Sequence, residues 1–499
     1  HAAWAVAAEA LVRLERSDEA VEAARRAQRP ELPERLALLA WVLAAAGEAR
    51  EARMWLAELG ADVAVPVAWE RVARAHDHLG EVSAAVAAHG RARDLAPDDM
   101  GLALRYAERL ERAGRVVQAG QVVDEVLEAR PGWPPARRVR VRLLAQSKDL
   151  DGAAAEARVL LDGGELAEDV AGGLMLELAR IEARRGDSRA SVHWARKGNL
   201  RALEAWRSRG GDPDALWQEL DSLARARLPP PPPSSGRDRA APPRHRAAFV
   251  MGFPRSGTTL VQQMIAAHPA VLTFDEAPLV DRALDEVLPG ASWVRAAQRS
   301  ADPAIAERLR AAWWKAAVRR IGGARSSPAL VIDKLPLNLL RLDVVVRAFP
   351  DAPVVLVVRD PRDAVVSAFL QDFHLNGAMA QLTDLVRAAR LYDRAMATWR
   401  RAAPANGIVL RYESLVEDPQ GTWRPVVEQL GLLWDAAILG ARHDGDRSVR
   451  TPSYAAIREP LYRRSIGRWQ GYAEWLADAA PFLDAWIEHF GYAPTASFA

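Results

Sequence analysis

A glycine-containing loop between an apolar run and an amphipathic stretch constrains this chain more than any other feature. Residues 247–251 are apolar and predict a short buried strand. The spacing Gly252-x-x-x-x-Gly257 then predicts a tight turn, and the helical spacing of later apolar residues predicts a helix from Thr258. The N–H groups in the first turn of such a helix lack intrahelical partners and favour an anion. The stretch therefore predicts a strand, an anion-binding loop and a helix.

The loop has the spacing of a P-loop but lacks its lysine. In nucleotide triphosphatases a lysine follows the second glycine and reaches the β- and γ-phosphates. Here that residue is Thr258, and the cation of the loop is Arg255, inside the turn. We therefore predict a loop that binds an anion without the usual arrangement of triphosphate and Mg²⁺.

Length and composition predict a globular protein of more than one domain. The chain has 499 residues, of which 50% are hydrophobic and 26% charged, with a net charge of +2. This charge gives no bulk attraction to nucleic acid or to an anionic membrane surface. The absence of cysteine excludes disulfides, zinc–thiolate sites and cysteine nucleophiles. Without a long apolar run or a signal-peptide pattern, we expect a cytoplasmic protein that binds neither nucleic acid nor membrane.

Residues 1–226 repeat with a period of 34. Gly80 and Gly114 are separated by this distance, and so are Pro97 and Pro131. A unit of helix, glycine turn, helix and proline stop resembles the tetratricopeptide repeat, so we expect an α-helical superhelix over this region. Its concave surface would bind a peptide or protein partner, or the helices would serve only as a scaffold.

A proline-rich linker over 227–246 precedes a domain over 247–499. Five consecutive prolines, Pro229 to Pro233, predict a stiff polyproline II spacer. Beyond the linker, apolar runs over 329–332, 353–358 and 408–410 predict further strands with helices between them. We therefore expect an α/β, P-loop-like domain with a mostly parallel sheet, which binds ligands at the carboxyl ends of its strands.

Charged residues follow two of these predicted strands. Asp333-Lys334 ends one strand, and residues 359–363 (Arg-Asp-Pro-Arg-Asp) follow the next. Ser367 lies eight residues after Arg359, on a predicted helix. An arginine and a hydroxyl beside a nucleotide crevice suit a phosphate monoester, because arginine donates paired, charge-assisted hydrogen bonds. The pattern predicts a second phosphate site beside the loop.

Together these motifs resemble the sulfotransferases that use 3′-phosphoadenosine 5′-phosphosulfate (PAPS). Residues 254–260 are similar to the 5′-phosphosulfate loop of that family, and residues 359–367 to its 3′-phosphate motif. Residues 333–338 are similar to its lysine segment, and residues 450–469 to its C-terminal cofactor segment. The pattern most resembles the tyrosylprotein sulfotransferase type, whose bacterial members carry N-terminal tetratricopeptide repeats.

The resemblance implies two sets of site residues. Those implied to bind PAPS are Arg255, Ser256, Gly257, Thr258, Thr259, Arg359, Ser367, Tyr412, Ser453 and Arg468. Those implied in catalysis are Glu276 as the base, with Lys334, Arg255 and Ser453 meeting negative charge on the departing oxygen.

The residue types suit transfer of a sulfuryl group from PAPS to a hydroxyl. A phenol has a pKa of about 10, so a positioned carboxylate helps to remove its proton. The sulfonate carries less charge than a transferring phosphoryl group, so we expect no metal. The acceptor is expected to be a peptide, a protein, for example through a tyrosine, or a small hydroxylated metabolite. Pro278 stands where the tyrosyl enzymes carry a basic residue, which counts against acidic peptides.

Other interpretations stay open at this point. His268 is an alternative base, because many sulfotransferases use histidine, and Lys334 is alternatively a structural partner of Asp333. For the whole chain, a P-loop kinase or ATPase is a second hypothesis, because residues 329–333 resemble a Walker B strand. A repeat scaffold with an inactive sulfotransferase-like domain is a third.

Overall fold

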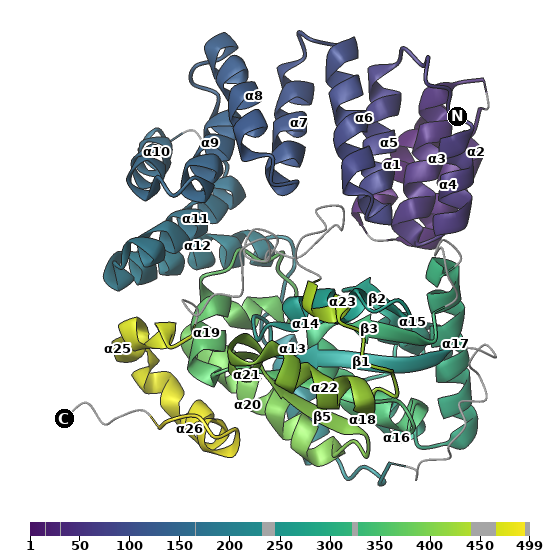
Figure 1. The fold of residues 1–499 in the computed structure, drawn as a ribbon, viewed down its shortest axis with the longest axis vertical. Helices are drawn as coiled ribbons and strands as arrows, with labels where there is room; N and C mark the ends of the chain where they lie inside the picture. Colours follow the sequence, from purple (N-terminus) through teal and green to yellow (C-terminus); the bar gives the residue numbers. More distant parts are fainter. Residues whose placement is uncertain are drawn as a thin grey trace. The chain divides into compact units, whose positions relative to one another are not determined.

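The computed structural model describes residues 1–14, 16–29, 31–164, 166–231, 245–321, 328–440 and 466–494 (Figure 1). Ser453 and most of the predicted linker lie outside these residues. The chain forms two compact units. The first consists chiefly of His1–Leu160, and the second chiefly of Leu161–Ala316, Ser327–Arg442 and the C-terminal segment.

The first unit is built from helices that pack in consecutive pairs. They are α1 (Ala2–Arg13), α2 (Ser17–Ala27), α3 (Pro33–Ala46), α4 (Ala49–Ala57), α5 (Pro66–Leu79), α6 (Val82–Leu95), α7 (Met100–Arg112), α8 (Val116–Ala129), α9 (Pro134–Gln146) and α10 (Leu150–Asp162). The turns within pairs contain Gly80 and Gly114, at φ of 78° and 75°. Pro97 and Pro131 lie between pairs, as predicted. The expected architecture of repeated helix pairs is confirmed.

The turn geometry of the repeat persists beyond the point where its glycine is lost. Lys148, 34 residues after Gly114, adopts the left-handed conformation at φ 68°. Such a φ is uncommon for a residue with a side chain. The sequence pattern therefore weakens here although the helices continue.

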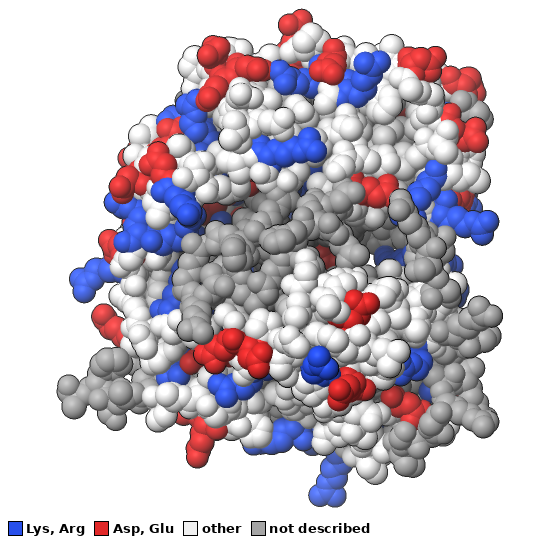
Figure 2. Space-filling view, viewed as in Figure 1, with Lys and Arg blue, Asp and Glu red and all other residues white. Residues whose placement is uncertain are grey.

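Small side chains allow the paired helices to approach closely. Alanines at the repeated positions are fully buried, with 0% exposure; they are Ala73, Ala85, Ala107, Ala119 and Ala153. Ion pairs also join neighbouring helices, as between Arg109 Nη2 and Asp77 Oδ2 at 2.5 Å. Figure 2 shows acidic and basic side chains interspersed on one face of the molecule.

The second unit is organised around a five-stranded parallel sheet in the order β2-β3-β1-β4-β5. The strands are β1 (Arg246–Gly252), β2 (Val271–Asp275), β3 (Leu330–Lys334), β4 (Val354–Val358) and β5 (Gly407–Arg411). The predicted strands and the parallel sheet are confirmed. Sequence reasoning did not assign β2, a short edge strand in which Leu272 and Thr273 are only partly buried.

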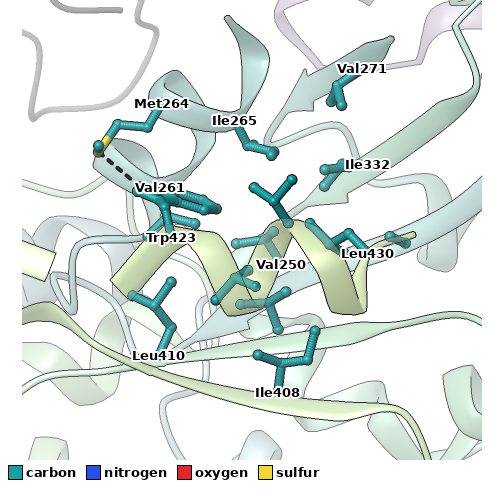
Figure 3. Packing of buried hydrophobic residues seen from close by; sticks show 14 of the residues in the cluster. Val250, Val261, Met264, Ile265, Val271, Ile332, Ile408, Leu410, Trp423 and Leu430 are labelled. Atoms are coloured by element: carbon teal, nitrogen blue, oxygen red, sulfur yellow. Dashed lines mark hydrogen bonds between the residues drawn. The ribbon is translucent and has the colours of Figure 1, made fainter. Parts of the chain in front are cut away.

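Alternate residues of β1 enter two hydrophobic layers, because successive side chains of a strand point to opposite faces. Val250 belongs to a cluster that includes Ile265 of α14 (Thr258–Ala266) and Trp423 of α22 (Pro419–Gln429) (Figure 3). Phe249 lies on the other face, with its ring centroid 5.8 Å from that of Trp313. The sheet is thus covered on both faces, as its continuous apolar strands require.

The second unit also contains further helices and turns, the last of which belong to the C-terminal segment. They are α15 (Leu279–Val287), α16 (Trp293–Arg299), α17 (Pro303–Ile321), α18 (Leu342–Ala348), α19 (Pro361–Phe369), α20 (Leu385–Ala402), α21 (Tyr412–Glu417), α23 (Ala437–Gly440), α25 (Ala473–Leu476) and α26 (Ala480–His489), with 3₁₀ turns η1 (Pro336–Arg341), η2 (Met379–Thr383), η4 (Arg468–Tyr472) and η5 (Ala477–Ala479). Among the described helices, none combines the length and apolarity needed to cross a membrane.

Three helices before the linker pack within the unit of the sheet. They are α11 (Glu168–Arg185), α12 (Ser188–Arg207) and α13 (Ala215–Arg225). Asn199 Nδ2 donates to the backbone oxygen of Phe369 at 2.9 Å, and Trp217 Nε1 donates to Gln381 Oε1 at 2.8 Å. By packing, the first unit therefore ends near Leu160, whereas the boundaries at 226 and 247 stay a sequence prediction.

This packing predicts the outcome of truncation. A chain of residues 161–499 should fold, whereas residues 227–499 should be less stable, because the buried bonds to Phe369 and Gln381 are lost. With the lost apolar burial, we expect the free energy of unfolding to fall by at least about 3 kcal/mol. Urea unfolding followed by circular dichroism measures the difference. Equal stability of the two chains would show that α11–α13 do not belong to this unit.

Candidate active site

The predicted site residues follow the carboxyl ends of the strands. β1 leads into the loop 253–257, and β3 ends at Lys334. Glu276 follows β2, Arg359 follows β4 and Tyr412 follows β5. Because all five strands are parallel, these ends share one edge of the sheet. Both predicted phosphate motifs therefore meet at that edge.

The loop between β1 and α14 has an unusual backbone conformation. Arg255 and Gly257 are left-handed, at φ of 69° and 98°. A Cβ atom added to Gly257 would lie 2.5 Å from Cδ2 of Tyr412, so a larger residue would be strained and would clash. Gly257 provides no side-chain cap for α14. Because Gly257 has no side chain to cap the helix, the helix start is suited to binding an anion through backbone N–H groups.

Hydroxyl groups of the loop are buried around this helix start. Ser256, Thr258 and Thr259 are 1%, 3% and 8% exposed. Ser256 Oγ has no hydrogen-bond partner among the described residues. A buried hydroxyl without a partner is unfavourable. An anion oxygen at this position would satisfy it, so the loop fits a phosphate or sulfate group.

Arg359 connects the two predicted phosphate motifs. Its Nη1 donates to the backbone oxygen of Arg255 at 3.2 Å, and Arg255 Nε donates to Ser367 Oγ at 3.3 Å. The Arg359 guanidinium also lies 5.3 Å from the ring centroid of Tyr412. These four residues, which the resemblance implies for cofactor binding, come from separate elements and form one cluster.

Lys334 is fully buried and lies between two carboxylates. Its Nζ is 2.6 Å from Asp275 Oδ1 and 3.1 Å from Glu276 Oε1. The sheet sets this spacing, because Asp275 is in register with Lys334 and the Glu276 N–H donates to the Lys334 oxygen at 2.9 Å. The Glu276 side chain is 39% exposed, at a backbone φ of 51°. Strained backbone of this kind is typical of functional sites.

The alternative pairing of Lys334 with Asp333 is wrong. Asp333 accepts hydrogen bonds from Trp313 Nε1 at 3.0 Å and Asn338 Nδ2 at 3.2 Å. Neighbouring residues of a strand face opposite sides of the sheet, so Lys334 turns to Asp275 instead. Sequence reasoning missed Asp275, although its position directly before Glu276 at a strand end was a usable signal.

His268 has a structural role. Its Nε2 lies 2.9 Å from the Leu433 oxygen, and its Nδ1 accepts from the Ala270 N–H at 3.1 Å. Both ring nitrogens are therefore engaged by backbone groups, which argues against His268 as the base. Within the described ranges, no group of three or more His, Asp or Glu side chains is placed to hold a metal ion.

Asp363 fastens the C-terminal segment that carries Arg468. The Gly467 N–H donates to Asp363 Oδ2 at 2.7 Å, and the Trp469 N–H donates to Oδ1 at 2.8 Å. Asp363 Oδ2 also lies 3.8 Å from Arg359 Nη2. The half-buried Arg468 is thus held beside the 3′-phosphate motif, whereas Ser453 lies outside the described residues. Asp363 belongs to the predicted 3′-phosphate motif, but the sequence pattern predicted no role for it.

Comparison with known proteins finds a family match within the second unit. Residues 247–436 match the sequence model of the sulfotransferase family. An uncharacterised Aquifex aeolicus protein is 29% identical over 248 residues, which cover 48% of this chain and 32% of that protein. Protein-tyrosine sulfotransferase 2 of Gallus gallus is 26% identical over 268 residues, covering 50% of this chain and 70% of that one. A sulfotransferase domain from the Synechococcus olefin synthase aligns with 52% of this chain and 98% of its own, at 21% identity and a TM-score of 0.35.

Residues 247–436 therefore form a domain of the sulfotransferase family. The alignment with the Aquifex aeolicus protein spans about a third of that protein's length.

The environment of Asp363 predicts a pH dependence of stability. Burial raises the pKa of Asp363 from 3.8 to about 6, against the opposing influence of Arg359 and the two N–H donors. Because the folded protein favours the protonated carboxyl, stability is highest below the unfolded pKa and falls as pH rises through about 6. The difference in pKa corresponds to about 3 kcal/mol.

The side chain in the variant Asp363→Asn does not titrate, so the variant lacks the fall in stability that ionisation of Asp363 causes. The free energy of unfolding of the variant, relative to wild type, should therefore rise by up to about 3 kcal/mol from pH 4 to pH 7. Urea unfolding of both proteins at fixed ionic strength measures this trend. A difference that stays constant with pH would contradict it.

Proposed function

We propose that this chain transfers a sulfuryl group from PAPS to an acceptor hydroxyl. The observation that carries the proposal is the cluster of Arg255, Arg359 and Ser367 at the sheet edge of a sulfotransferase-family domain. When bound, PAPS would supply the sulfuryl group. The fit of the loop to an anion, above all the buried Ser256 hydroxyl, supports the assignment.

The two phosphate-bearing ends of the nucleotide would bind to different residues. The loop Arg255–Thr259 would bind the 5′ end through its N–H and hydroxyl groups. Arg359 and Ser367 would bind the 3′-phosphate, because a guanidinium donates paired bonds to such a group. Tyr412, Ser453 and Arg468 complete the proposed set.

Glu276 would act as the general base. It is the more exposed of the two carboxylates on Lys334, with its side chain 39% exposed against 17% for Asp275. It can therefore reach an acceptor hydroxyl and take its proton. The buried ammonium of Lys334, together with Arg255 and Ser453, would stabilise negative charge on the departing oxygen. Each preorganised donor of this kind typically lowers the activation free energy by about 2.7–4 kcal/mol.

The proposed acceptor is a phenolic hydroxyl, such as a protein tyrosine. The similarity to protein-tyrosine sulfotransferases of Gallus gallus and Danio rerio supports this class. Pro278, at the start of α15, offers no cationic side chain, so we do not restrict the acceptor to acidic peptides. For the repeat helices of the first unit we propose binding of a protein partner, which the repeat architecture supports.

Arg359→Ala should weaken nucleotide binding by at least about tenfold, because hydrogen bonds to charged groups are worth about 1.5–3 kcal/mol. Thermal stabilisation by adenosine 3′,5′-bisphosphate measures this, since stabilisation follows RT ln(1 + [L]/Kd). ADP, and ATP with Mg²⁺, serve as comparison ligands. Arg424→Ala is the matched control, because Arg424 also lies over an aromatic ring, that of Trp434 at 5.1 Å. Selective stabilisation by ATP with Mg²⁺ would support a kinase instead.

Glu276→Gln should retain nucleotide affinity and lose most of its turnover with a phenolic acceptor. Amides are poor bases, and general base catalysis contributes typically ~10²–10⁴-fold. Transfer of ³⁵S from labelled PAPS to a tyrosine peptide or p-nitrophenol measures turnover. Glu286→Gln is the control, because Glu286 forms an exposed ion pair with Lys315 at 3.0 Å. Wild-type turnover in the Glu276 variant would exclude Glu276 as the base.

A further inference from the structure

The first turn of α19 holds the C-terminal segment through two adjacent side chains. Asp363 accepts the backbone N–H groups of Gly467 and Trp469, at 2.7 and 2.8 Å. The guanidinium of Arg362 lies 3.7 Å from the ring centroid of Trp469. Both the backbone and a side chain of the segment are therefore fixed on the helix that carries the 3′-phosphate motif.

The two hydrogen bonds to Asp363 flank a single residue, Arg468. A backbone fixed on both sides of a residue limits where its side chain can reach. Arg468 is also the first residue of the η4 turn and is half-buried. Its position is thus set by a contact between α19 and a segment more than 100 residues later in the chain.

The carboxylate of Asp363 also faces the other arginine of the proposed nucleotide site. Its Oδ2, which accepts the Gly467 N–H, lies 3.8 Å from Arg359 Nη2. One fully buried carboxyl group therefore contacts both the Arg359 guanidinium and the backbone around Arg468. A buried carboxylate is costly to ionise, and burial raises the pKa of Asp363. Groups that lower stability in this way are concentrated at functional sites.

We propose that Asp363 is a positioning residue, which places Arg468 beside Arg359 so that both arginines bind the same nucleotide. The inference rests on the proposed function, because it requires a nucleotide at this edge of the sheet. Asp363 does not contact the nucleotide in this arrangement. It acts through the backbone of residues 467–469.

The chemistry of the contact requires a carboxylate. Two N–H donors approach two different oxygens of Asp363. Asparagine has the same shape but only one acceptor oxygen, and its NH₂ group would face one of the N–H donors. Asp363→Asn therefore releases one side of Arg468 while it keeps the packing of the buried site.

The test compares the affinity of four proteins for adenosine 3′,5′-bisphosphate by isothermal titration calorimetry at pH 7. They are the full-length wild type, Asp363→Asn, Arg468→Ala and the double variant. Asp363→Asn should bind about tenfold more weakly, as expected for one lost hydrogen bond to a charged group. Arg468→Ala should bind at least as weakly. The double variant should match Arg468→Ala within about threefold, because Asp363 acts through Arg468.

A merely structural role would give a different pattern. The two substitutions would then weaken binding additively, because each would act independently of the other. Asp384→Asn is the matched control, since Asp384 accepts the Val386 and Arg387 N–H groups at 3.0 Å. That control should bind like wild type.

Failure of the positioning role and failure of the proposed function give different results. Wild-type affinity in Asp363→Asn or in Arg468→Ala, or additivity in the double variant, overturns the positioning role and leaves the proposed function intact. A wild type that does not bind the bisphosphate overturns the proposed function, and the positioning role with it. If Asp363→Asn does not fold, Asp363→Glu replaces it, because the added methylene displaces both oxygens. Unchanged affinity in that variant overturns the positioning role.

Discussion

Parallel pairing of the five strands is the constraint on which the site depends. The register places Lys334 of β3 opposite Asp275 of β2 on one side and Val250 of the central β1 on the other. The same pairing aligns the ends of β4 and β5, so that Arg359 and Tyr412 follow adjacent strands. Because parallel strands end at one edge, motifs from across the domain meet without a dedicated scaffold.

Buried charged side chains are the second feature of this edge of the sheet. Lys334 is completely buried, and two carboxylates compensate it. Asp363 is also buried, and its charge is supported by Arg359 and by two backbone N–H donors. Buried charges lower stability unless they are paired. These charges are concentrated at one sheet edge, where the buried Ser256 hydroxyl also lacks a hydrogen-bond partner among the described residues. Both features distinguish this region from the ordinary core.

Packing crosses the boundary that the sequence suggests between repeats and the α/β domain. Helices α11–α13 follow α1–α10 within the helical region that the sequence predicts, but they pack in the unit of the sheet. Buried side chains of α12 and α13 donate hydrogen bonds to residues of that unit. Asn199 and Trp217 are the clearest examples, because each donates a buried hydrogen bond to a partner more than 160 residues later in the chain. Helical periodicity reports which residues are buried within a helix. It does not report against which element that helix packs.

The sequence by itself determined the repeated helix pairs and the strand–loop–helix around Gly257, and it predicted the two phosphate motifs. These features are local: periodicity, glycine at left-handed turns and short motif spacings need no distant partner. Only the tertiary structure decided that Lys334 pairs with Asp275 and Glu276 rather than Asp333. It also decided that both nitrogens of His268 bond to backbone groups. Strand register and long-range contacts set these partners, because they depend on residues that the chain brings together only when it folds.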